Sequence, residues 1–377
     1  MNQLLQLPFF SDADRALARG LQASAASHQW LNPEQGDDRA ALKSALQTLA
    51  QWGTLKLATT QPWRLTSMAL AREVLAYHAG IADLALAMQG LGALPLLLGG
   101  SPAQQALLPG AAAGEHCLAF AITEPDAGSD LSRIALVARR ERGDYVLEGV
   151  KHLVSNVGTA THYVTFARTS AGGRGITAFV VPADSPGLRL APQVPISPHP
   201  LGRMDFLGVR LPESSRIGAE GDGMKLALAT LGRMRVTVAA AANGFARRAL
   251  DEALAYARRR ELFGATLAEK PLAQALLAEM RARLDASQLL TYRAAWEFDQ
   301  GRERIPLEAA IAKWQATENA QWIIDKALQL AGGQGVLQGS VFERLYREIR
   351  PLRIYEGASE VQQLVIAGEM LKEPTRE

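Results

Sequence analysis

The segment Arg353-Ile354-Tyr355-Glu356-Gly357-Ala358-Ser359-Glu360 lies near the end of the chain, where one helical region stops and the last one begins. It places one carboxylate, Glu356, between an aromatic residue and a glycine, directly before a helical pattern from Val361 to Leu371. Such a carboxylate can be buried, and burial raises its pKa towards neutrality, as a general base requires. The alternative is a turn residue near a helix N-terminus, where the helix dipole favours an acid. These eight residues alone leave both interpretations open.

The length and charge of the chain limit its class. It has 377 residues, and single cores stop growing at about 250–300 residues, so we expect two or three packed units. Charge is nearly balanced, with 40 Lys and Arg against 38 Asp and Glu, and there is no long basic run with interleaved aromatics. We therefore expect no nucleic-acid partner. The single cysteine, Cys117, excludes an internal disulfide framework and fits a reducing compartment, so we expect a cytoplasmic protein.

Neither a secretion signal nor a membrane span is expected. Residues Met1 to Phe10 lack a basic region followed by a long apolar core. The most apolar long stretch, Ala79 to Leu98, is interrupted by Asp83, Gln89 and Pro95, and we interpret it as a core helix and turn. The six histidines form no i, i+4 pair beside an acid and there is no CxxC motif, so no metal site is predicted.

The secondary-structure pattern changes twice, which predicts an α, then β, then α organisation. Residues 1–117 are helical, with caps at Ser11 and Asp37 and a start signal at Ser101-Pro102 for a helix to about Leu108. Residues 118–220 show short β-branched runs between turns, typical of a small antiparallel domain or barrel. Residues 221–377 return to helices long enough for a four-helix bundle. We expect these at Gly223–Arg259, Pro271–Gln300, Pro306–Ala331, Val341–Glu348 and Ser359–Leu371.

Three further segments are candidate ligand-binding loops. Residues 121–130 (AITEPDAGSD) combine hydroxyls, a proline turn and a glycine; residues 258–264 (RRRELFG) end a helix in arginines; residues 329–335 (QLAGGQG) end another in glycines. Arginines can grip a pyrophosphate, and glycines let the backbone approach a cofactor closely. Capped turns and helix stops explain the same patterns. The glycines of 332–335 do not have the GxGxxG spacing of a βαβ unit, so a Rossmann site is not supported.

In this order, the four segments resemble those of the acyl-CoA dehydrogenases, FAD enzymes with an α-helical domain, a β domain and a C-terminal four-helix bundle. The family's TEPxAGSD, RxxFG, QxxGGxG and IYEGTSE motifs match Thr123 to Asp130, Arg260 to Gly264, Gln329 to Gly335 and Ile354 to Glu360. The resemblance extends from about Ser101 to Leu371. The first hundred residues share with the family only a helical sequence pattern. It implies a mostly α fold with a central antiparallel β domain, or barrel, and a C-terminal bundle.

The resemblance also implies a role for the residues that match the substrate site. Glu356 would be the catalytic base, Arg235 would line the catalytic cavity, and Gly357 would support the thioester. Ser129 would face the FAD pyrophosphate or the acyl thioester. Some relatives carry the base beside the arginine instead; Met234 occupies that position here, which supports Glu356.

The implied FAD contacts come from several parts of the chain. Ile122 and Thr123 would bind the flavin edge. A second set would be donated to the FAD of a neighbouring subunit, which implies a homo-oligomer, a dimer or commonly a homotetramer: Arg260, Phe263, Gln329, Gly332 and Gly333. The remaining implied cofactor contacts are Leu153, Ser155, Ala358 and Glu360.

The implied reaction is the α,β-desaturation of an acyl thioester in fatty acid metabolism. Glu356 would remove the α-proton while the β-hydrogen passes as hydride to flavin N5. Fixed donors to the thioester carbonyl contribute roughly 3 kcal/mol each. An electron-transfer flavoprotein would then accept the electrons, rather than NAD.

Several positions depart from the family pattern. Leu153 stands where members usually have an aromatic residue that covers the flavin, Pro271 where many have a glutamine, and Ala358 where the family has threonine. Gly232 replaces an acid, and the stretch Pro198 to Val209 is shortened, which leaves coenzyme A and an acyl carrier protein open as thioester carriers. The alternatives are a flavin oxidase or monooxygenase of the same fold, an acyl-carrier-protein-linked dehydrogenase, and a non-catalytic FAD-binding scaffold.

Overall fold

The computed structural model describes residues 3–34, 36–171, 175–302 and 304–372. Contacts divide the chain into two compact units. The helical unit comprises Met1–His28, Arg64–Asp83 and Arg235–Glu377, and the sheet unit comprises Gln29–Trp63 and Leu84–Met234. Each unit thus combines segments that are far apart in the sequence. The boundaries after residues 117 and 220 follow the secondary structure and stay a prediction.

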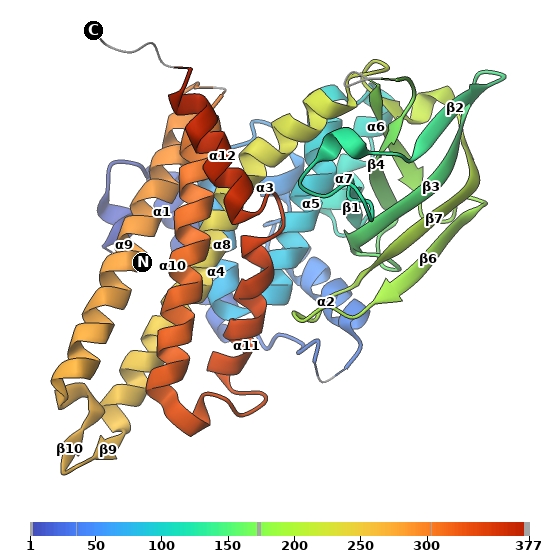
Figure 1. The fold of residues 1–377 in the computed structure, drawn as a ribbon. Coiled ribbons are helices and arrows are strands. Elements are labelled where there is room, and N and C mark those ends of the chain that lie inside the picture. Colours follow the sequence, from blue (N-terminus) through green and yellow to red (C-terminus); the bar gives the residue numbers. More distant parts are fainter. Residues whose placement is uncertain (1–2, 35, 172–174, 303, 373–377) are drawn as a thin grey trace, which may run out of the picture. The chain divides into compact units, whose positions relative to one another are not determined.

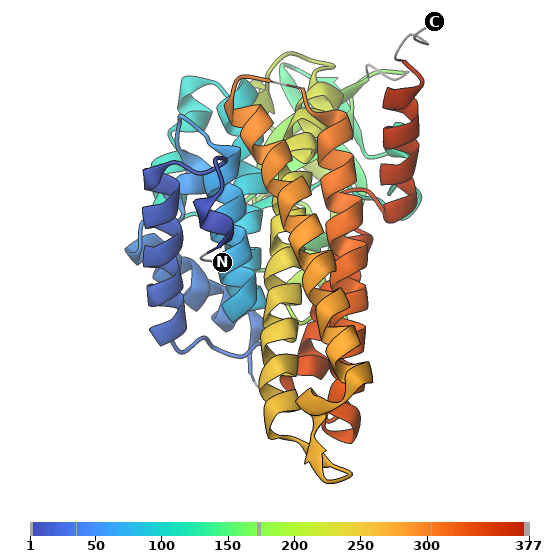
Figure 2. The same cartoon turned by 90° about the vertical axis from the view of Figure 1, so that its left-hand side faces the viewer.

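The helical unit is a set of long helices in which α9 packs on α10, and α10 also contacts α11 and α12. Figure 2 shows α8, α9 and α10 side by side. The β9–β10 hairpin joins α8 to α9 (Figure 1). The elements are η1 (Leu4–Gln6), α1 (Asp12–Ser27), α4 (Leu65–His78), most of α8 (Gly223–Arg259), β9 (Glu261–Leu262), β10 (Ala265–Thr266), η4 (Leu267–Glu269), α9 (Pro271–Asp299), α10 (Pro306–Ala331), η5 (Gly332–Gln334), α11 (Val341–Ile349), η6 (Arg350–Arg353) and α12 (Ser359–Met370).

Local signals explain where these helices begin and end. Ser11 caps α1 in a reciprocal capping box with Asp14. Proline begins α9 and α10 at the first helical position, where its missing N–H costs nothing. Gly332, with φ of +59°, ends α10. The predicted bounds of α8 and α10 are confirmed, and those of α9, α11 and α12 are confirmed to within one residue.

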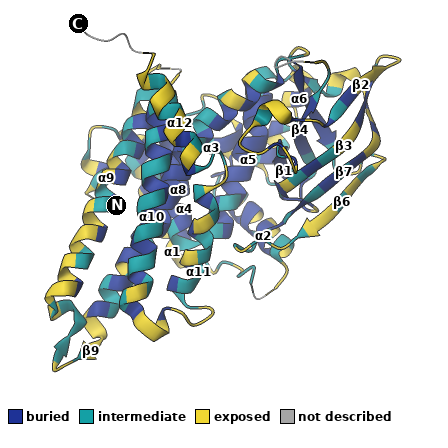
Figure 3. Ribbon diagram, in the orientation of Figure 1, coloured by how far each residue is buried: buried dark blue, intermediate teal, exposed yellow. Residues whose placement is uncertain are grey.

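The core of the helical unit is apolar, and a few buried polar groups form hydrogen bonds between its helices. One apolar cluster joins α1, α4, α8 and α9 through Leu5, Phe10, Ala18, Ala69, Leu70, Ala240 and Tyr292. The Asp299 carboxylate at the end of α9 accepts the N–H groups of Leu65 and Thr66 at 2.8 and 3.0 Å, so it caps α4 from another helix. Figure 3 shows α10 buried or intermediate over nearly its whole length, so most of its surface is covered by other parts of the protein.

The sheet unit is organised around one sheet whose strand order is β6-β7-β3-β2-β4-β5-β8, with β1 beside β4. Most neighbours are antiparallel, as predicted, whereas β1 and β2 each pair with β4 in parallel. Its elements are α2 (Asp38–Gln51), α3 (Lys56–Thr59), α6 (Pro102–Gln105), α7 (Leu108–Ala112), β1 (Leu118–Ala121), η2 (Leu131–Arg133), β2 (Val137–Glu141), β3 (Asp144–Ser155), β4 (His162–Arg168), β5 (Ile176–Pro182), β6 (Leu188–Gln193), β7 (Leu201–Leu211), η3 (Glu213–Ser215) and β8 (Arg216–Ile217).

Two details differ from the sequence-based expectation. The helix expected from Ser101 to about Leu108 is two short helices, α6 and α7, because Pro109, the second residue of α7, has no N–H to donate to the turn before it. The apolar stretch after Ala79 forms one helix, α5 (Gly80–Gly99), which contains Pro95. By length and composition α5 could cross a membrane, but 83% of its apolar 18-residue window is buried, which is typical of a core helix.

Candidate active site

Glu356 lies in a tight loop between η6 and α12. Its backbone has a left-handed φ of +55°, and Gly357 follows with a φ of +96°. Such a conformation costs a non-glycine residue roughly 1–3 kcal/mol and persists only where the surroundings impose it. A Cβ at Gly357 would lie 2.4 Å from Gln362 Nε2, so any other residue here would displace this side-chain amide. Glu356 precedes the N-cap residue Ala358 and does not serve as that cap.

One carboxylate anchors both ends of this loop to α10. Glu318 accepts hydrogen bonds from Arg353 Nε at 2.8 Å and from Ser359 Oγ at 2.5 Å. Arg353 also forms an ion pair with Glu318 Oε2 at 2.7 Å. A bidentate arginine–carboxylate pair is among the more directional contacts in proteins. The loop is therefore fixed just before Ile354 and just after Ala358.

The two carbonyl groups in the middle of the loop each face a cation. Arg235 Nε on α8 donates to the Glu356 carbonyl at 2.9 Å, and Lys313 Nζ on α10 donates to the Gly357 carbonyl at 2.8 Å. Gln362 Nε2 on α12 shares the Gly357 carbonyl at 2.9 Å. Three helices thus hold the left-handed backbone. The structure places Glu356, Gly357 and Arg235 in direct contact, as expected for one site.

The Glu356 carboxyl group is poised between its protonated and ionised forms. Burial raises its pKa to about 7, against the opposing effect of Arg72, Arg235 and Lys313. Its Oε2 atom is buried and accepts no hydrogen bond from the described residues. A buried acceptor without a partner is rare in native structures. This carboxyl group is therefore suited to exchange a proton with a ligand near neutral pH.

A buried ion pair lies beside Glu356. Arg72 on α4 donates to both carboxylate oxygens of Asp83, at 2.7 and 2.8 Å, and to Thr237 Oγ1 at 2.9 Å. Asp83 raises the pKa of Glu356 and Arg72 lowers it. Burial also raises the pKa of the Tyr355 hydroxyl far above its usual value, so this neighbour stays neutral. The charge around Glu356 is thus set by groups on α4, α5, α8 and α10.

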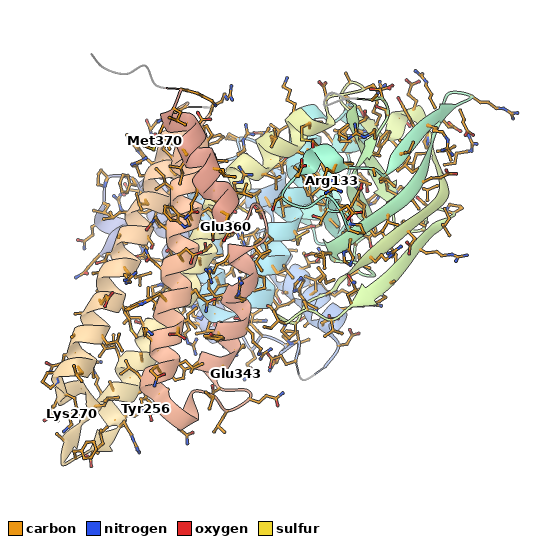
Figure 4. The ribbon with its side chains drawn as sticks, in the orientation of Figure 1. Arg133, Tyr256, Lys270, Glu343, Glu360 and Met370 are labelled. Atoms are coloured by element: carbon orange, nitrogen blue, oxygen red, sulfur yellow. The ribbon has the colours of Figure 1, made fainter. Side chains whose placement is uncertain are left out.

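A second group of predicted cofactor residues lies at one end of the helical unit. Phe263 and Gly264 form the tip of the β9–β10 hairpin, with φ of +51° and +73°. The Phe263 side chain is 93% exposed. Tyr256 on α8 and Lys270, the N-cap residue of α9, mark this end in Figure 4. A strained backbone that presents a bare aromatic ring indicates a surface made for contact.

The remaining predicted residues of this group follow the end of α10. Gln329, Gly332 and Gly333 are exposed, and a Cβ at either glycine would meet no atom within 4 Å. Lys313, which contacts the Glu356 loop, precedes Gln329 by 16 residues on the same helix, or about 24 Å along its axis. The structure therefore does not bring Gln329 to the Glu356 loop within one chain.

In the sheet unit, the predicted loop that begins at Ile122 is fixed by a buried ion pair. Lys151 Nζ on β3 donates to Glu124 Oε1 at 2.7 Å and to the Ile122 carbonyl at 2.9 Å. Glu124 also accepts the N–H groups of Ala135 and Leu136 at 2.7 and 3.0 Å. Ile122 is buried, Thr123 is half-buried and Ser129 is exposed.

The end of β3 presents the other predicted residues of the sheet unit. A register irregularity between Lys151 and Val154 gives Leu153 a φ of +53° and leaves its side chain 54% exposed. The His152 N–H donates to the Thr123 carbonyl at 2.8 Å, so Leu153 and Thr123 lie at the same edge of this unit. Ser155 Oγ lies 3.3 Å from His199 Nε2.

Sequence analysis missed the residues that hold these loops. Lys313 and Arg72 lie in largely apolar helical stretches, and Lys151 is buried on the strand β3. A charged residue inside an apolar helical face is unusual, because lysine and arginine are almost never fully buried unless they are paired. That signal marks the residues as candidates, but it does not say which loop each one contacts.

Comparison with known proteins identifies the family. Residues 119–209 match the acyl-CoA dehydrogenase middle domain and residues 221–371 match the acyl-CoA dehydrogenase C-terminal domain. The chain belongs to the acyl-CoA dehydrogenase family. This confirms the predicted family, fold class, FAD cofactor and oxidoreductase class.

Relatives in the acyl-CoA dehydrogenase family include enzymes named for both directions of reaction. The chain is 38% identical to a 3-(aryl)acrylate reductase of Clostridium sporogenes, over 75% of this chain and 76% of that protein. It is 35% identical to cyclohexane-1-carbonyl-CoA dehydrogenase of Geobacter metallireducens, over 82% of each. The structure of butyryl-CoA dehydrogenase from Megasphaera elsdenii superposes with a TM-score of 0.89 at 28% identity, and covers 96% of this chain and 99% of that one.

The described residues fit the family's FAD in each unit taken by itself. In the helical unit, the buried Glu356 Oε2 atom has no hydrogen-bond partner among the described residues and is available to a ligand. In the sheet unit, the exposed Leu153 side chain offers an apolar surface to a flat ring.

Proposed function

We propose that this acyl-CoA dehydrogenase removes hydrogen from Cα and Cβ of an acyl-CoA thioester, with Glu356 as the base that takes the α-proton. The observation that supports this assignment most directly is the Glu356 carboxyl group itself. It is buried, its pKa is raised to about 7, and its loop is held in a left-handed conformation by Arg235, Lys313 and Gln362. An ordinary cap residue needs none of these.

The chain's own residues account for the proton transfer. Ionised Glu356 takes the α-proton, and its nearby cations favour the ionised form beforehand. After transfer the carboxyl group is neutral, which burial favours, so its pKa near 7 makes both states accessible. FAD, when bound, accepts the hydride from Cβ. The fixed loop keeps Glu356 in one position, so little reorganisation is needed at the moment of transfer.

The Glu356→Gln variant tests this assignment. We expect it to fold and to retain FAD, because glutamine preserves the shape and the backbone contacts, but to lose substrate-dependent flavin bleaching by at least a hundredfold. Anaerobic stopped-flow absorbance with an acyl-CoA measures the bleaching. Glu369→Gln, on the surface of α12 beside Lys372, is the matched control and should reduce its flavin normally. Unchanged bleaching in Glu356→Gln would refute the base.

A second candidate is the reverse reaction, reduction of an enoyl thioester. Its support is the 38% identity to an arylacrylate reductase, together with a Glu356 pKa near 7 that also permits proton donation to Cα. The two directions separate under anaerobic conditions. A dehydrogenase bleaches its flavin with saturated acyl-CoA, whereas a reductase recovers its yellow colour when an enoyl-CoA is added to the reduced protein.

We also propose that FAD is shared between subunits of a homo-oligomer, a dimer or tetramer. Arg260 and Phe263, with Gln329, Gly332 and Gly333, would contact the FAD of a neighbouring chain. The separation of about 24 Å along α10 supports this, because Gln329 and the Glu356 loop cannot both contact one flavin ring in a single chain. Phe263→Ala should lower FAD affinity and oligomer content together, as measured by sedimentation and flavin release.

The remaining assignments extend the same proposal. In the sheet unit, four residues would contact FAD: Ile122, Thr123, Leu153 and Ser155. Ser129 would contact the substrate or the FAD pyrophosphate. Ala358 and Glu360, beside Glu356, would also contact FAD. An electron-transfer flavoprotein is the proposed electron acceptor in a cytoplasmic setting and in fatty acid metabolism. The relative named as subunit CarC of a caffeyl-CoA reductase–Etf complex, 35% identical, supports that partner. Peroxide release during turnover in air would instead indicate the oxidase.

A further inference from the structure

Lys313 is a buried lysine at the centre of the helical unit. It lies on α10 within the stretch Ala309 to Ala316, and none of its surface is exposed. Burial lowers its pKa to about 8, so its charge is retained against a desolvation penalty. A methionine of similar length would pack there without that penalty. The helix alone therefore does not require a lysine at this position.

The contacts of Lys313 point to the loop rather than to an ion pair. Its Nζ donates to the Gly357 carbonyl at 2.8 Å, and no carboxylate in the described part of the chain lies within 4.0 Å of that atom. The charged groups that act on Lys313 are Glu356, Arg235, Glu318 and Glu360. Among these charged groups Glu356 has the largest effect on the pKa of Lys313, and Lys313 in turn lowers the pKa of Glu356.

The backbone conformation gives this contact a specific meaning. Because Glu356 and Gly357 are both left-handed, their carbonyls turn towards cations instead of continuing into α12. Arg235 binds the first carbonyl and Lys313 the second. Gln362 Nε2 also donates to the second carbonyl, at 2.9 Å, so loss of Lys313 would leave this carbonyl with one neutral donor in place of a neutral and a charged one. A more weakly held loop would relax more easily towards ordinary helical or extended backbone, and the Glu356 carboxyl group would move with it.

We propose that Lys313 is a positioning residue for the base: its ammonium group holds the Gly357 carbonyl, and so fixes the backbone that presents Glu356, while its charge favours the ionised form of that carboxyl group. This inference rests on the proposed role of Glu356. It contains two claims that can be tested separately: the hydrogen bond of Lys313 to the Gly357 carbonyl fixes the loop, and the Lys313 charge favours ionised Glu356.

Three substitutions separate the claims. Lys313→Met removes the donor and the charge, Lys313→Gln removes the charge but retains a donor, and Lys313→Arg retains both. Lys326→Met, on the same helix beside Asp325, is the matched control. Two readouts are compared: the pH dependence of anaerobic flavin reduction by acyl-CoA, and the infrared band of the protonated Glu356 carboxyl group, assigned by its loss in Glu356→Gln. The infrared band needs no turnover.

Loss of the charge should move the acid limb of flavin reduction, and the midpoint of the infrared band, upwards by about one pH unit in Lys313→Met and Lys313→Gln. Above that limb Lys313→Gln should recover most of the wild-type rate, whereas Lys313→Met should stay at least tenfold slower because the loop is released. Lys313→Arg should lie close to wild type in its midpoint, and Lys326→Met should be unchanged.

An unchanged midpoint in Lys313→Gln, with a wild-type rate, would overturn the proposal, and this variant decides the outcome if Lys313→Met does not fold. A lower melting temperature alone, with both readouts unchanged, would also overturn it, because that is what a purely structural lysine predicts. Flavin bleaching that survives in Glu356→Gln would instead refute the role of Glu356 and leave the Lys313 contact to be explained differently.

Discussion

Replacing Asp83 by asparagine removes one partner of the buried pair beside Glu356 while keeping its shape. Arg72 would retain its contact with Thr237 but lose two charge-assisted hydrogen bonds of 2.7 and 2.8 Å. The two side chains are only 2% and 6% exposed, so water cannot replace the lost carboxylate. Removing one member of such a pair costs about 3–5 kcal/mol, most of it the penalty of an unpaired buried charge.

Urea unfolding of the FAD-loaded protein measures this cost. The matched control is Asp285→Asn, which breaks the Arg281–Asp285 pair on α9, where both side chains are about half exposed. That change should cost less than about 0.5 kcal/mol. If Asp83→Asn costs less than about 1 kcal/mol, similar to the control, the reasoning about the buried pair is wrong.

The same variant also tests the electrostatics of Glu356. Asp83 raises the pKa of Glu356, so Asp83→Asn should lower it, and the acid limb of flavin reduction should move to lower pH. Movement to higher pH would mean that Asp83 does not act on Glu356 through its charge.

Three further changes test other parts of the structure. The pKa of Glu356 is raised from 4.5 to about 7, so its contribution to stability is complete below about pH 4.5 and is lost as the pH rises through 7. Between pH 5 and 8 the unfolding free energy of wild type should therefore fall by about 2.5 kcal/mol relative to Glu356→Gln. Parallel pH profiles of the two proteins would contradict this. Lys151→Met leaves the buried Glu124 carboxylate with its two backbone N–H donors but without its cation. This change should cost about 3–5 kcal/mol in urea unfolding, and a cost under about 1 kcal/mol would show that the pair does not fix the loop. Phe263→Asn suits the left-handed turn and should stabilise an isolated chain by about 1 kcal/mol while weakening subunit association in sedimentation; unchanged association would exclude Phe263 from the interface.

The helices were largely predictable from the sequence because their signals are local. Proline at the first position and glycine after the last one set the bounds of α10. The prediction of one helix from Ser101 to about Leu108 was wrong, because Pro109 is a second helix-start signal and marks the beginning of α7. The parallel pairing of β1 and β2 with β4 depends on strands that are distant in sequence, which local patterns do not specify.

The site was predictable only in part, because local sequence patterns do not show which distant residues contact it. Glu356 and Gly357 could be recognised from one short segment, because aromatic, acid and glycine are adjacent there. The groups that hold and charge that segment, Lys313, Arg72 and Asp83, lie up to 284 residues away and meet it only through the packing of α4, α5 and α10. No spacing rule links such residues before the fold is known.

The double attachment of the Glu356 loop to Glu318 has a consequence for motion. Only five residues, Ile354 to Ala358, lie between Arg353 and Ser359, and both of those bind the same carboxylate. Opening the loop therefore requires both ends to be released almost together, which makes partial excursions rare and hydrogen exchange of its amides slow. The backbone that carries the base therefore does not shift to follow acyl groups of different size. Any breadth in acyl selectivity must come from walls of the site that lie outside this loop.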